Sequence, residues 1–421
     1  MALTVKRHHI HDVRFGTAEG LSDGVLTVDP EKLTALLTED PLIRSVHLDV
    51  AAPGEKTRII HILDAITPIC SSDGANCFPG FLGTPETCGR GTVCELRGVY
   101  LLTCGTFPSE DAILRTREAV VDMWGEGSRY SPFASSMNLV LTLDADTEAE
   151  KRSTDAAVRL AGLKAAEYLA RIAEECEPDE TEEIGVLTPA PELPGVCAML
   201  QLASIGTLFD TFLYGRTVDG ILPTLISRQE LLAGAVVTDE YFYGGQRQPT
   251  CMYQHNPIVE ELLRRHGETV NFKGIILCRG YNNTNIDKRR AAGYCANLAE
   301  MLGATGVILH PESGGNSHVD CMLTAQACEK IGISTVILAA EMGDVESRDV
   351  SLIDYVPEAT AIVSAGNREA LVAIEKAERV LGGVSFLEST LGADEEQKIP
   401  LNFYFCATSQ IGAWNISMDA M

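Results

Sequence analysis

The sequence predicts an α/β protein of two lobes, in which the C-terminal lobe is a doubly wound parallel sheet and the N-terminal lobe is a strand-rich α+β unit. Two observations predict this class. After residue 270, short and almost continuously apolar runs alternate with helical patterns of ten or more residues, which is typical of βαβ units. Before residue 150, short segments of alternating apolar and polar residues are separated by loops rich in glycine and proline.

The C-terminal lobe, residues 271–421, is expected to hold four strands and at least two helices. The expected strands are residues 274–278, 306–310, 333–340 and 360–364, and the expected helices are residues 285–302 and 317–331. Gly303 follows the first helix, as is common at a helix C-terminus. Right-handed crossovers between parallel strands would place helices on both faces of the sheet.

The N-terminal lobe, residues 1–175, is expected to end in a long helix over residues 148–172. Asp29 and Pro30 predict the start of a shorter helix, with a cap followed by proline at the first helical position. The strands expected in this lobe are residues 24–28, 46–50, 57–63, 92–104 and 138–143.

Two segments are expected to join the lobes. Residues 176–194 are acidic and contain several prolines, so we expect a solvated linker. Residues 195–270 form a connecting region. Within it, residues 239–254 show little periodicity and contain Gly244 and Gly245, so we expect an exposed loop there.

Composition excludes several classes of partner. The chain has 421 residues, with 59 acidic against 33 basic side chains and a net charge of −26, which disfavours nucleic acid and anionic membranes. No run approaches the roughly 18 apolar residues of a membrane span, and the N-terminus lacks the apolar core of a signal peptide. The 13 cysteines form no CxxC pair and suggest free thiols, so we expect a cytoplasmic protein.

The loops after the expected C-terminal strands are the best candidates for a ligand site, because ligands of open parallel sheets bind beyond the strands' carboxyl ends. The residues found there are His310, Glu312, Gly314, Gly315, Asn316, Glu341 and Asn367. Paired glycines before a helix suit a carboxylate or a phosphate, although they also suit a plain turn. No G-x-G-x-x-G is present, so a dinucleotide is not expected.

Metal binding and cysteine catalysis are weaker hypotheses. The ligand-type residues His310, Glu312, His318, Asp320 and Cys321 lack any zinc-ligand spacing, so no metal is expected. Cys88 and Cys94 supply only two ligands. A nucleophilic Cys251, with His255 four residues on, would need a nearby positive charge that the sequence does not reveal.

Several stretches of the chain resemble one family, the component B alpha/beta precursor of glycine, sarcosine and betaine reductases. The resemblance covers essentially the whole chain and is carried by residues 24–28, 78–81, 122–138, 159–164, 199–201, 210–211, 214–215 and 256–267. It implies a subunit of a cytosolic reductase complex that cleaves a C–N bond in a small amino acid or its N-methylated form. In that family an internal cysteine splits the precursor and leaves a pyruvoyl group, and a partner subunit supplies the selenol or thiol.

The sequence departs from the family at the splitting position. With residues 234–237 and Asn256-Pro257 in register, Tyr241 stands where the family has its cysteine. An acyl shift needs a nucleophile on Cβ, which tyrosine lacks, so we expect an unsplit chain with no pyruvoyl group. Thr250 and Cys251 are the nearby residues that could restore splitting in a shifted register.

The resemblance leaves three hypotheses open. The favoured one is a subunit of an oligomeric reductase complex that holds a small-molecule substrate while a thiol- or selenol-bearing partner subunit provides the nucleophile. In it, Gly314, Gly315 and Asn316 bind a substrate carboxylate, and Glu312 or His310 serves as proton donor or orienter. Glu341 and Asn367 would close the crevice. The alternatives are a stand-alone α/β enzyme built around His310, Glu312 and Asp320, with or without a metal, and a catalytically silent scaffold subunit.

Overall fold

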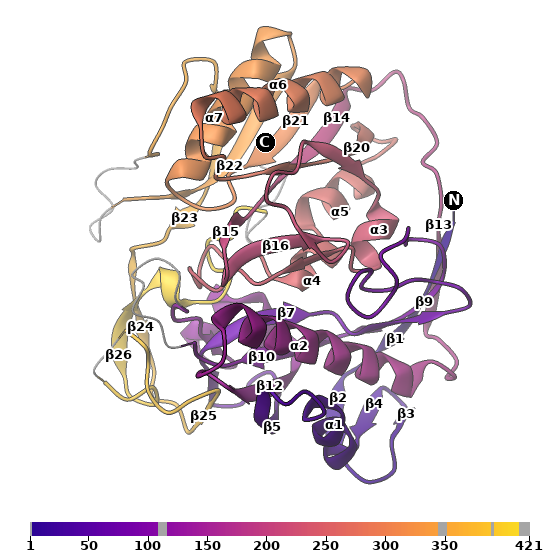
Figure 1. Cartoon of the computed structure of the whole chain (residues 1–421), viewed down its shortest axis with the longest axis vertical. Coiled ribbons are helices and arrows are strands. Elements are labelled where there is room, and N and C mark those ends of the chain that lie inside the picture. Colours follow the sequence, from indigo (N-terminus) through magenta and orange to yellow (C-terminus); the bar gives the residue numbers. More distant parts are fainter. Residues whose placement is uncertain (1, 108–115, 344–351, 389–390, 412–421) are drawn as a thin grey trace.

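The computed structural model describes residues 2–107, 116–343, 352–388 and 391–411, which form two lobes stacked along the long axis of the molecule (Figure 1). The C-terminal sheet and its helices make up the upper lobe, and the N-terminal strands make up the lower one. Within the described part of the chain, no helix combines the length and apolar character needed to cross a membrane.

The N-terminal lobe contains two four-stranded sheets, in the orders β13-β1-β9-β8 and β5-β12-β10-β7. Their strands are β1 (Leu3–His9), β5 (Ile43–Ala51), β7 (Ile62–Ile66), β8 (Ile69–Ser72), β9 (Gly91–Arg97), β10 (Val99–Cys104), β12 (Met137–Ala145) and β13 (Glu180–Ile184). The long helix α2 (Lys151–Ala173) packs its apolar face, which includes Leu163, Ala166 and Ala170, against strands of both sheets.

Smaller elements complete this lobe. They are β2 (Asp12–Phe15), β3 (Gly20–Ser22), β4 (Val25–Val28), α1 (Pro30–Leu37), β6 (Thr57–Ile59), β11 (Val121–Asp122), and the 3₁₀ turns η1 (Glu126–Tyr130) and η2 (Pro132–Ser135). Helix α1 begins where the sequence predicts, because the Asp29 carboxylate accepts hydrogen bonds from the N–H groups of Glu31 (3.0 Å) and Lys32 (3.3 Å).

The C-terminal lobe is built on a six-stranded sheet of order β18-β20-β14-β21-β22-β23, parallel except for β18. Its strands are β14 (Gly195–Leu202), β18 (Thr224–Ile226), β20 (Asn271–Arg279), β21 (Gly306–His310), β22 (Ser334–Glu341) and β23 (Ile362–Asn367). Helices α6 (Asn285–Met301) and α7 (Asn316–Lys330) cover one face, whereas α3 (Arg228–Leu232), α4 (Thr250–Gln254) and α5 (Pro257–Arg264) cover the other. The predicted α/β class with a doubly wound sheet is confirmed.

The boundaries of the lobes differ from the expected ones. The sheet of the C-terminal lobe takes its central strand, β14, and its edge strand, β18, from the connecting region, so this lobe begins near residue 195 rather than 271. Within the expected linker, β13 pairs antiparallel with β1, and Glu180 lies opposite Arg7. Opposite charges on facing strands stabilise such a pair, which explains why an acidic segment forms a strand here.

The chain leaves the C-terminal lobe after β23. Strand β25 (Arg379–Leu381) pairs with β6 of the N-terminal lobe, and the pair β24 (Leu371–Ile374) and β26 (Gln397–Pro400) lies beside it (Figure 1). The remaining short elements are β15 (Ser204–Gly206), β16 (Phe209–Leu213), β17 (Arg216–Thr217), β19 (Val236–Thr238) and η3 (Leu401–Phe403).

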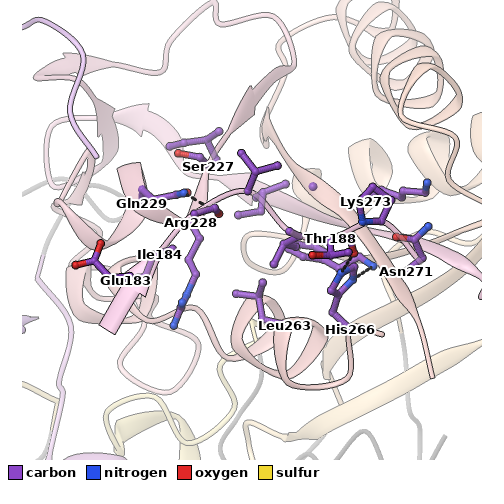
Figure 2. A pocket seen from close by; sticks show the side chains of 18 of the residues that line it. Glu183, Ile184, Thr188, Ser227, Arg228, Gln229, Leu263, His266, Asn271 and Lys273 are labelled. Atoms are coloured by element: carbon purple, nitrogen blue, oxygen red, sulfur yellow. Dashed lines mark hydrogen bonds between the residues drawn. The ribbon is translucent and has the colours of Figure 1, made fainter. Parts of the chain in front are cut away.

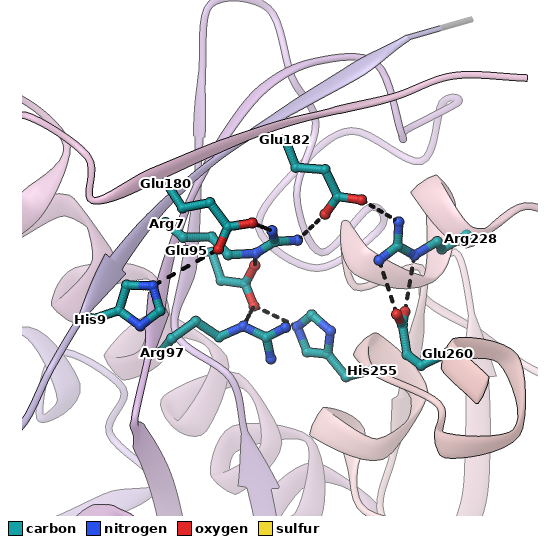
Figure 3. A network of polar contacts seen from close by, with 9 residues as sticks. All are labelled: Arg7, His9, Glu95, Arg97, Glu180, Glu182, Arg228, His255 and Glu260. Carbon is teal, nitrogen blue, oxygen red and sulfur yellow. Dashed lines mark hydrogen bonds and ion pairs between the residues drawn. The ribbon is translucent and has the colours of Figure 1, made fainter. Parts of the chain in front are cut away.

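A buried polar network connects the two lobes (Figure 3). Arg7 on β1 contacts Glu95 on β9, and His255, which follows α4, contacts the same carboxylate. Burial by itself would raise the pKa of Glu95, but His255 and the neighbouring arginines outweigh it and hold that pKa to about 2. Glu95 is therefore ionised at neutral pH and joins the N-terminal sheet to the helices under the C-terminal sheet.

Candidate functional site

The topology places a ligand crevice on both sides of β14. The helices that follow β14 in sequence pack on one face of the sheet, and the helices that follow its two neighbours, β20 and β21, pack on the other. Adjacent parallel strands whose helices diverge in this way form a topological switch point, where open α/β sheets bind their ligands. The carboxyl ends concerned are Leu202, Arg279 and His310.

The prediction of an exposed loop over residues 239–254 is wrong. Glu240, Arg247, Gln248 and Thr250 are at most 1% exposed, and the segment ends in α4. It lies between the lobes, where the Asp64 carboxylate of β7 accepts hydrogen bonds from the Thr250 hydroxyl (2.7 Å) and N–H (2.8 Å). The polar groups of this segment are satisfied by distant parts of the chain, and no local pattern reveals such burial.

Two buried carboxyl groups meet at the end of β21. Glu312 is fully buried, and its N–H donates to the side-chain oxygen of Gln201 on β14 (2.7 Å). The carboxyl group of Glu240, which is 1% exposed, lies close enough to that of Glu312 for their charges to repel. Two buried carboxylates that face each other disfavour full ionisation, because each negative charge raises the free energy of the other. Burial raises the pKa of Glu312 to about 8, and burial together with Glu312 raises the pKa of Glu240 well above its usual value. We call these two residues the carboxyl pair; it retains a proton at neutral pH.

His310 lies beside the carboxyl pair as a neutral base. Its Nδ1 donates to the carbonyl oxygen of Pro311 (3.0 Å), which leaves Nε2 as an acceptor that finds no donor in the described part of the chain. Burial lowers the pKa of His310 to about 4, so the ring is neutral at pH 7. Gln248 completes the cluster, because its amide donates to the Glu312 carbonyl (3.1 Å) and accepts from the Tyr253 hydroxyl (2.8 Å).

Asp320, the third candidate catalytic residue, has other partners. Its carboxylate forms an ion pair with Lys288 of α6 and accepts a hydrogen bond from the Asn282 amide (2.8 Å). Both oxygens are thus engaged in holding α6 to α7. Among the residues that the structure describes, no group of three or more His, Cys, Asp or Glu side chains could hold a metal ion.

The candidate substrate-binding residues lie at the carboxyl edge, where the sequence places them. Asn316 is exposed at the start of α7, after Gly315, whose φ of 86° favours glycine. The Gly314 carbonyl already accepts from the Tyr281 hydroxyl (2.7 Å). Glu341 and Asn367 are paired in register at the ends of β22 and β23, where Glu341 accepts from Ser364 (2.6 Å) and Asn367 accepts from the Glu369 N–H (2.9 Å).

Sequence reasoning missed Glu240, Gln248 and Tyr253, because all three lie in the segment that was expected to be an exposed loop. One signal could have found Glu240. The family register puts the splitting position at Tyr241, so its neighbour belongs to the region where the family carries out its chemistry. The sequence did identify Glu312 and His310 from their place after a strand.

A cavity with a volume of about 580 Å³ lies away from the carboxyl ends of the strands (Figure 2). It sits under residues 182–189 and at the amino end of β20, where the His266 ring donates from Nε2 to the Thr188 carbonyl (2.9 Å) and accepts at Nδ1 from the Phe272 N–H (3.0 Å). Ligands of parallel sheets bind at the opposite, carboxyl end of the strands. The candidate functional site is therefore the switch point around β14.

Comparisons with known proteins cover nearly the whole chain. The family model described as "Glycine/sarcosine/betaine reductase component B subunits" matches residues 1–419. The chain is 31% identical over 431 residues to the "Glycine reductase complex component B subunits alpha and beta" of Acetoanaerobium sticklandii, an alignment that covers 98% of each chain.

Two relatives from Peptoclostridium acidaminophilum give similar values. The "Sarcosine reductase complex component B subunit alpha" is 31% identical over 402 residues, which are 93% of this chain and 92% of the relative. The "Betaine reductase complex component B subunit alpha" is 30% identical over 444 residues, with 98% of each chain covered. No solved structure matches the chain.

Proposed function

Because the chain belongs to the family of glycine/sarcosine/betaine reductase component B subunits, we propose that it is an unprocessed alpha/beta-type subunit of such a reductase complex. It binds a small amino acid or an N-methylated amine for thiol- or selenol-dependent reductive cleavage of a C–N or related bond. The resemblance found in the sequence is confirmed by the family match, and the substrate and the unprocessed state are the parts that we propose.

The environment of Tyr241 carries the proposal of an unprocessed chain. The side chain is 1% exposed and stacks on Phe107, with ring centroids 5.9 Å apart. The Tyr241 N–H donates to the Leu208 carbonyl (2.9 Å), and the Tyr241 carbonyl accepts from the Arg247 guanidinium (2.8 Å). A phenol in this position cannot reach the preceding carbonyl, so the residues here do not fit a pyruvoyl group.

The two residues that could restore splitting are poorly placed for it. The Thr250 hydroxyl is hydrogen-bonded to Asp64, and Cys251 is 4% exposed. Burial raises the pKa of the Cys251 thiol well above its usual value, which keeps it protonated and weakly nucleophilic.

The burial of this chain's thiols supports a partner subunit as the source of the nucleophile. All 13 cysteines are free, and every one except Cys176 is buried. Burial raises the pKa of most of these thiols, including Cys88 to about 11 and Cys197 to about 12. Such thiols are poor nucleophiles. Thirteen free thiols also suit a reducing compartment, so we place the complex in the cytoplasm.

An intact-mass measurement of the purified protein is expected to show one polypeptide of about 45.4 kDa. The reason is that Tyr241 offers no Cβ nucleophile for an acyl shift. Hydroxylamine should leave this mass unchanged, whereas a pyruvate-capped peptide in the same tube should react. Two fragments, or a hydroxylamine adduct on one of them, would show that the chain is processed.

Native purification of the tagged protein from its own cells is expected to retain a second subunit with an exposed cysteine or selenocysteine. The subunit should be alkylated by iodoacetamide under native conditions, because a nucleophilic thiol must be accessible. The tagged chain serves as the internal control, because its 12 buried thiols should be alkylated only after denaturation and Cys176 alone should react before it. A chain that purifies alone and turns over its substrate would contradict this assignment.

A further inference from the structure

A polar pocket with a volume of about 410 Å³ opens at the carboxyl ends of β14 and β20, on one side of the switch point. It lies between α2, the start of α7 and the strand pair β15–β16. Charged groups of both signs line it, namely Arg152, Arg279, Asp210 and Asp219. A pocket with opposite charges suits a ligand that carries both charges itself.

The cationic side of the pocket is formed by Arg279 and Arg152. The Arg279 side chain is only 10% exposed; its guanidinium contacts Asp219 (2.9 Å) and the Ser204 carbonyl (3.1 Å), and its Nε has no acceptor among the described residues. Arg152 is exposed on α2 and forms no ion pair within that same set of residues. Asn316 also lines the pocket and is the first residue of the 15-residue helix α7, whose N-terminus carries partial positive charge.

The anionic side is formed by Asp210 on β16, which is 6% exposed. The Gly206 N–H and the Ser204 hydroxyl lie near its carboxyl group and favour the charged form. Burial, together with the carboxylates of Asp155 and Asp219, raises the pKa of Asp210 to about 6. At pH 7 Asp210 is therefore a carboxylate with little water around it, and a cation would stabilise it.

An aromatic wall lies next to these charges. Tyr281 lines the pocket, holds a φ of 59°, and is anchored through its hydroxyl to the Gly314 carbonyl. Its ring packs against that of Phe209, with centroids 5.7 Å apart. Aromatic faces attract alkylated ammonium groups.

We propose that this pocket binds a small zwitterion, with Arg279, Arg152 and the start of α7 holding its carboxylate and Asp210 holding its cationic nitrogen. The proposal rests on the proposed function and adds to it the place and manner of recognition. Ion pairing with Asp210 requires no free amine and no carbonyl on the protein, so it accepts primary, secondary and quaternary nitrogen alike. This suits a chain in which Tyr241 replaces the residue that would trap an amine covalently.

Calorimetric titration of the full chain with glycine, N-methylglycine and N,N,N-trimethylglycine tests the proposal. At least one of the three is expected to bind, and its affinity should exceed that of acetate and of tetramethylammonium at least tenfold, because each of these probes carries only one of the two charges. No detectable binding of all three zwitterions, or equal binding of a singly charged probe, overturns the proposal.

Substitutions separate the two subsites. Asp210→Asn and Arg279→Gln are each expected to weaken zwitterion binding at least tenfold, and Arg152→Gln severalfold. Arg152 is exposed on a helix, so its variant will fold even if a substitution at a buried position does not. Arg289→Gln, at an exposed position on α6 outside the pocket, is the matched control and should leave the affinity unchanged. Wild-type affinity in all three pocket variants overturns the proposal.

The pH dependence of zwitterion binding gives a second, independent test of the role of Asp210. The charged groups around it are Asp155 and Arg159 from α2, Asp219 after β17, Asp239 after β19 and Arg279 from β20. Wild-type affinity should fall below about pH 6, because protonation removes the charge that holds the cation. Asp210→Asn should remove this fall. If the fall persists in that variant, another group holds the cation.

The pocket and the proposed function can fail separately. A zwitterion site found elsewhere on the chain overturns the pocket assignment and leaves the proposed function intact. A processed chain, detected by intact mass, overturns the proposed function but says nothing about this pocket.

Discussion

The stability of the protein is expected to fall as the pH rises from about 6.5 to about 8, and replacing the carboxyl pair by Glu240→Gln/Glu312→Gln is expected to remove much of that fall. Glu312 keeps its proton to about pH 8 in the folded state, whereas an unfolded glutamate loses it near its ordinary value of 4.5. Between these values the folded state binds more protons, so unfolding becomes easier with rising pH. The slope is about 1.4 kcal/mol per pH unit for each proton.

Other titrating groups determine the pH range in which the stability of wild type and of the double variant should be compared. Burial lowers the pKa of His310 and His318 to about 4, so their effect has the opposite sign and is complete once the pH exceeds the ordinary histidine value of 6.5. Burial raises the pKa of Asp64 to about 7, so its effect has the same sign as that of the pair. The difference between wild type and the double variant above pH 6.5 isolates the contribution of Glu240 and Glu312.

Urea unfolding at several pH values, followed by circular dichroism, measures this difference. The control is Glu300→Gln, at an exposed position on α6, which should keep the wild-type slope. Parallel curves for wild type and the double variant across pH 6.5 to 8 would mean that the carboxyl pair holds no extra proton. A single Glu312→Gln variant should lie between the two, because Glu240 remains buried and burial still raises its pKa.

Asp122→Ala is expected to destabilise the protein by about 3–5 kcal/mol, because it leaves a buried guanidinium without its counter-charge. Arg58 on β6 is fully buried and contacts both oxygens of Asp122 on β11 (2.6 and 3.0 Å). Its remaining N–H groups donate to the carbonyls of Ala393 (2.7 Å) and Glu375 (2.9 Å), and the Tyr404 hydroxyl donates to Asp122 (2.6 Å). The pair therefore fastens the C-terminal segment to the N-terminal lobe.

Chemical denaturation again gives the measurement. Glu378→Ala, which removes an exposed carboxylate paired with Lys56, should change the free energy of unfolding little. The combination Arg58→Met/Asp122→Leu should recover most of the loss, because it removes both buried charges. If Asp122→Ala costs no more than the surface variant, Arg58 has another compensating charge and this account of the segment is mistaken.

Local sequence signals located most of the C-terminal sheet. The apolar runs of β20, β21 and β22, and the helical patterns of α6 and α7, mark elements that the structure confirms within a few residues. The same signals missed the central strand β14, although Val196–Leu202 is as apolar as its neighbours. An apolar run shows that a strand will be buried, but its partners in the sheet are decided by contacts far along the chain.

By itself the sequence determined the fold class, the family and the strand-end position of His310 and Glu312, because strand period, helix caps and motif order are local properties of the chain. Only the tertiary structure decided that Glu240 is buried close to Glu312, that Asp210 and Arg279 line one pocket, and that Arg58 holds the C-terminal segment. The members of these sets are separated by about 70 residues or more. Their pKa values and their charges depend on burial and on neighbours that only the packed chain supplies.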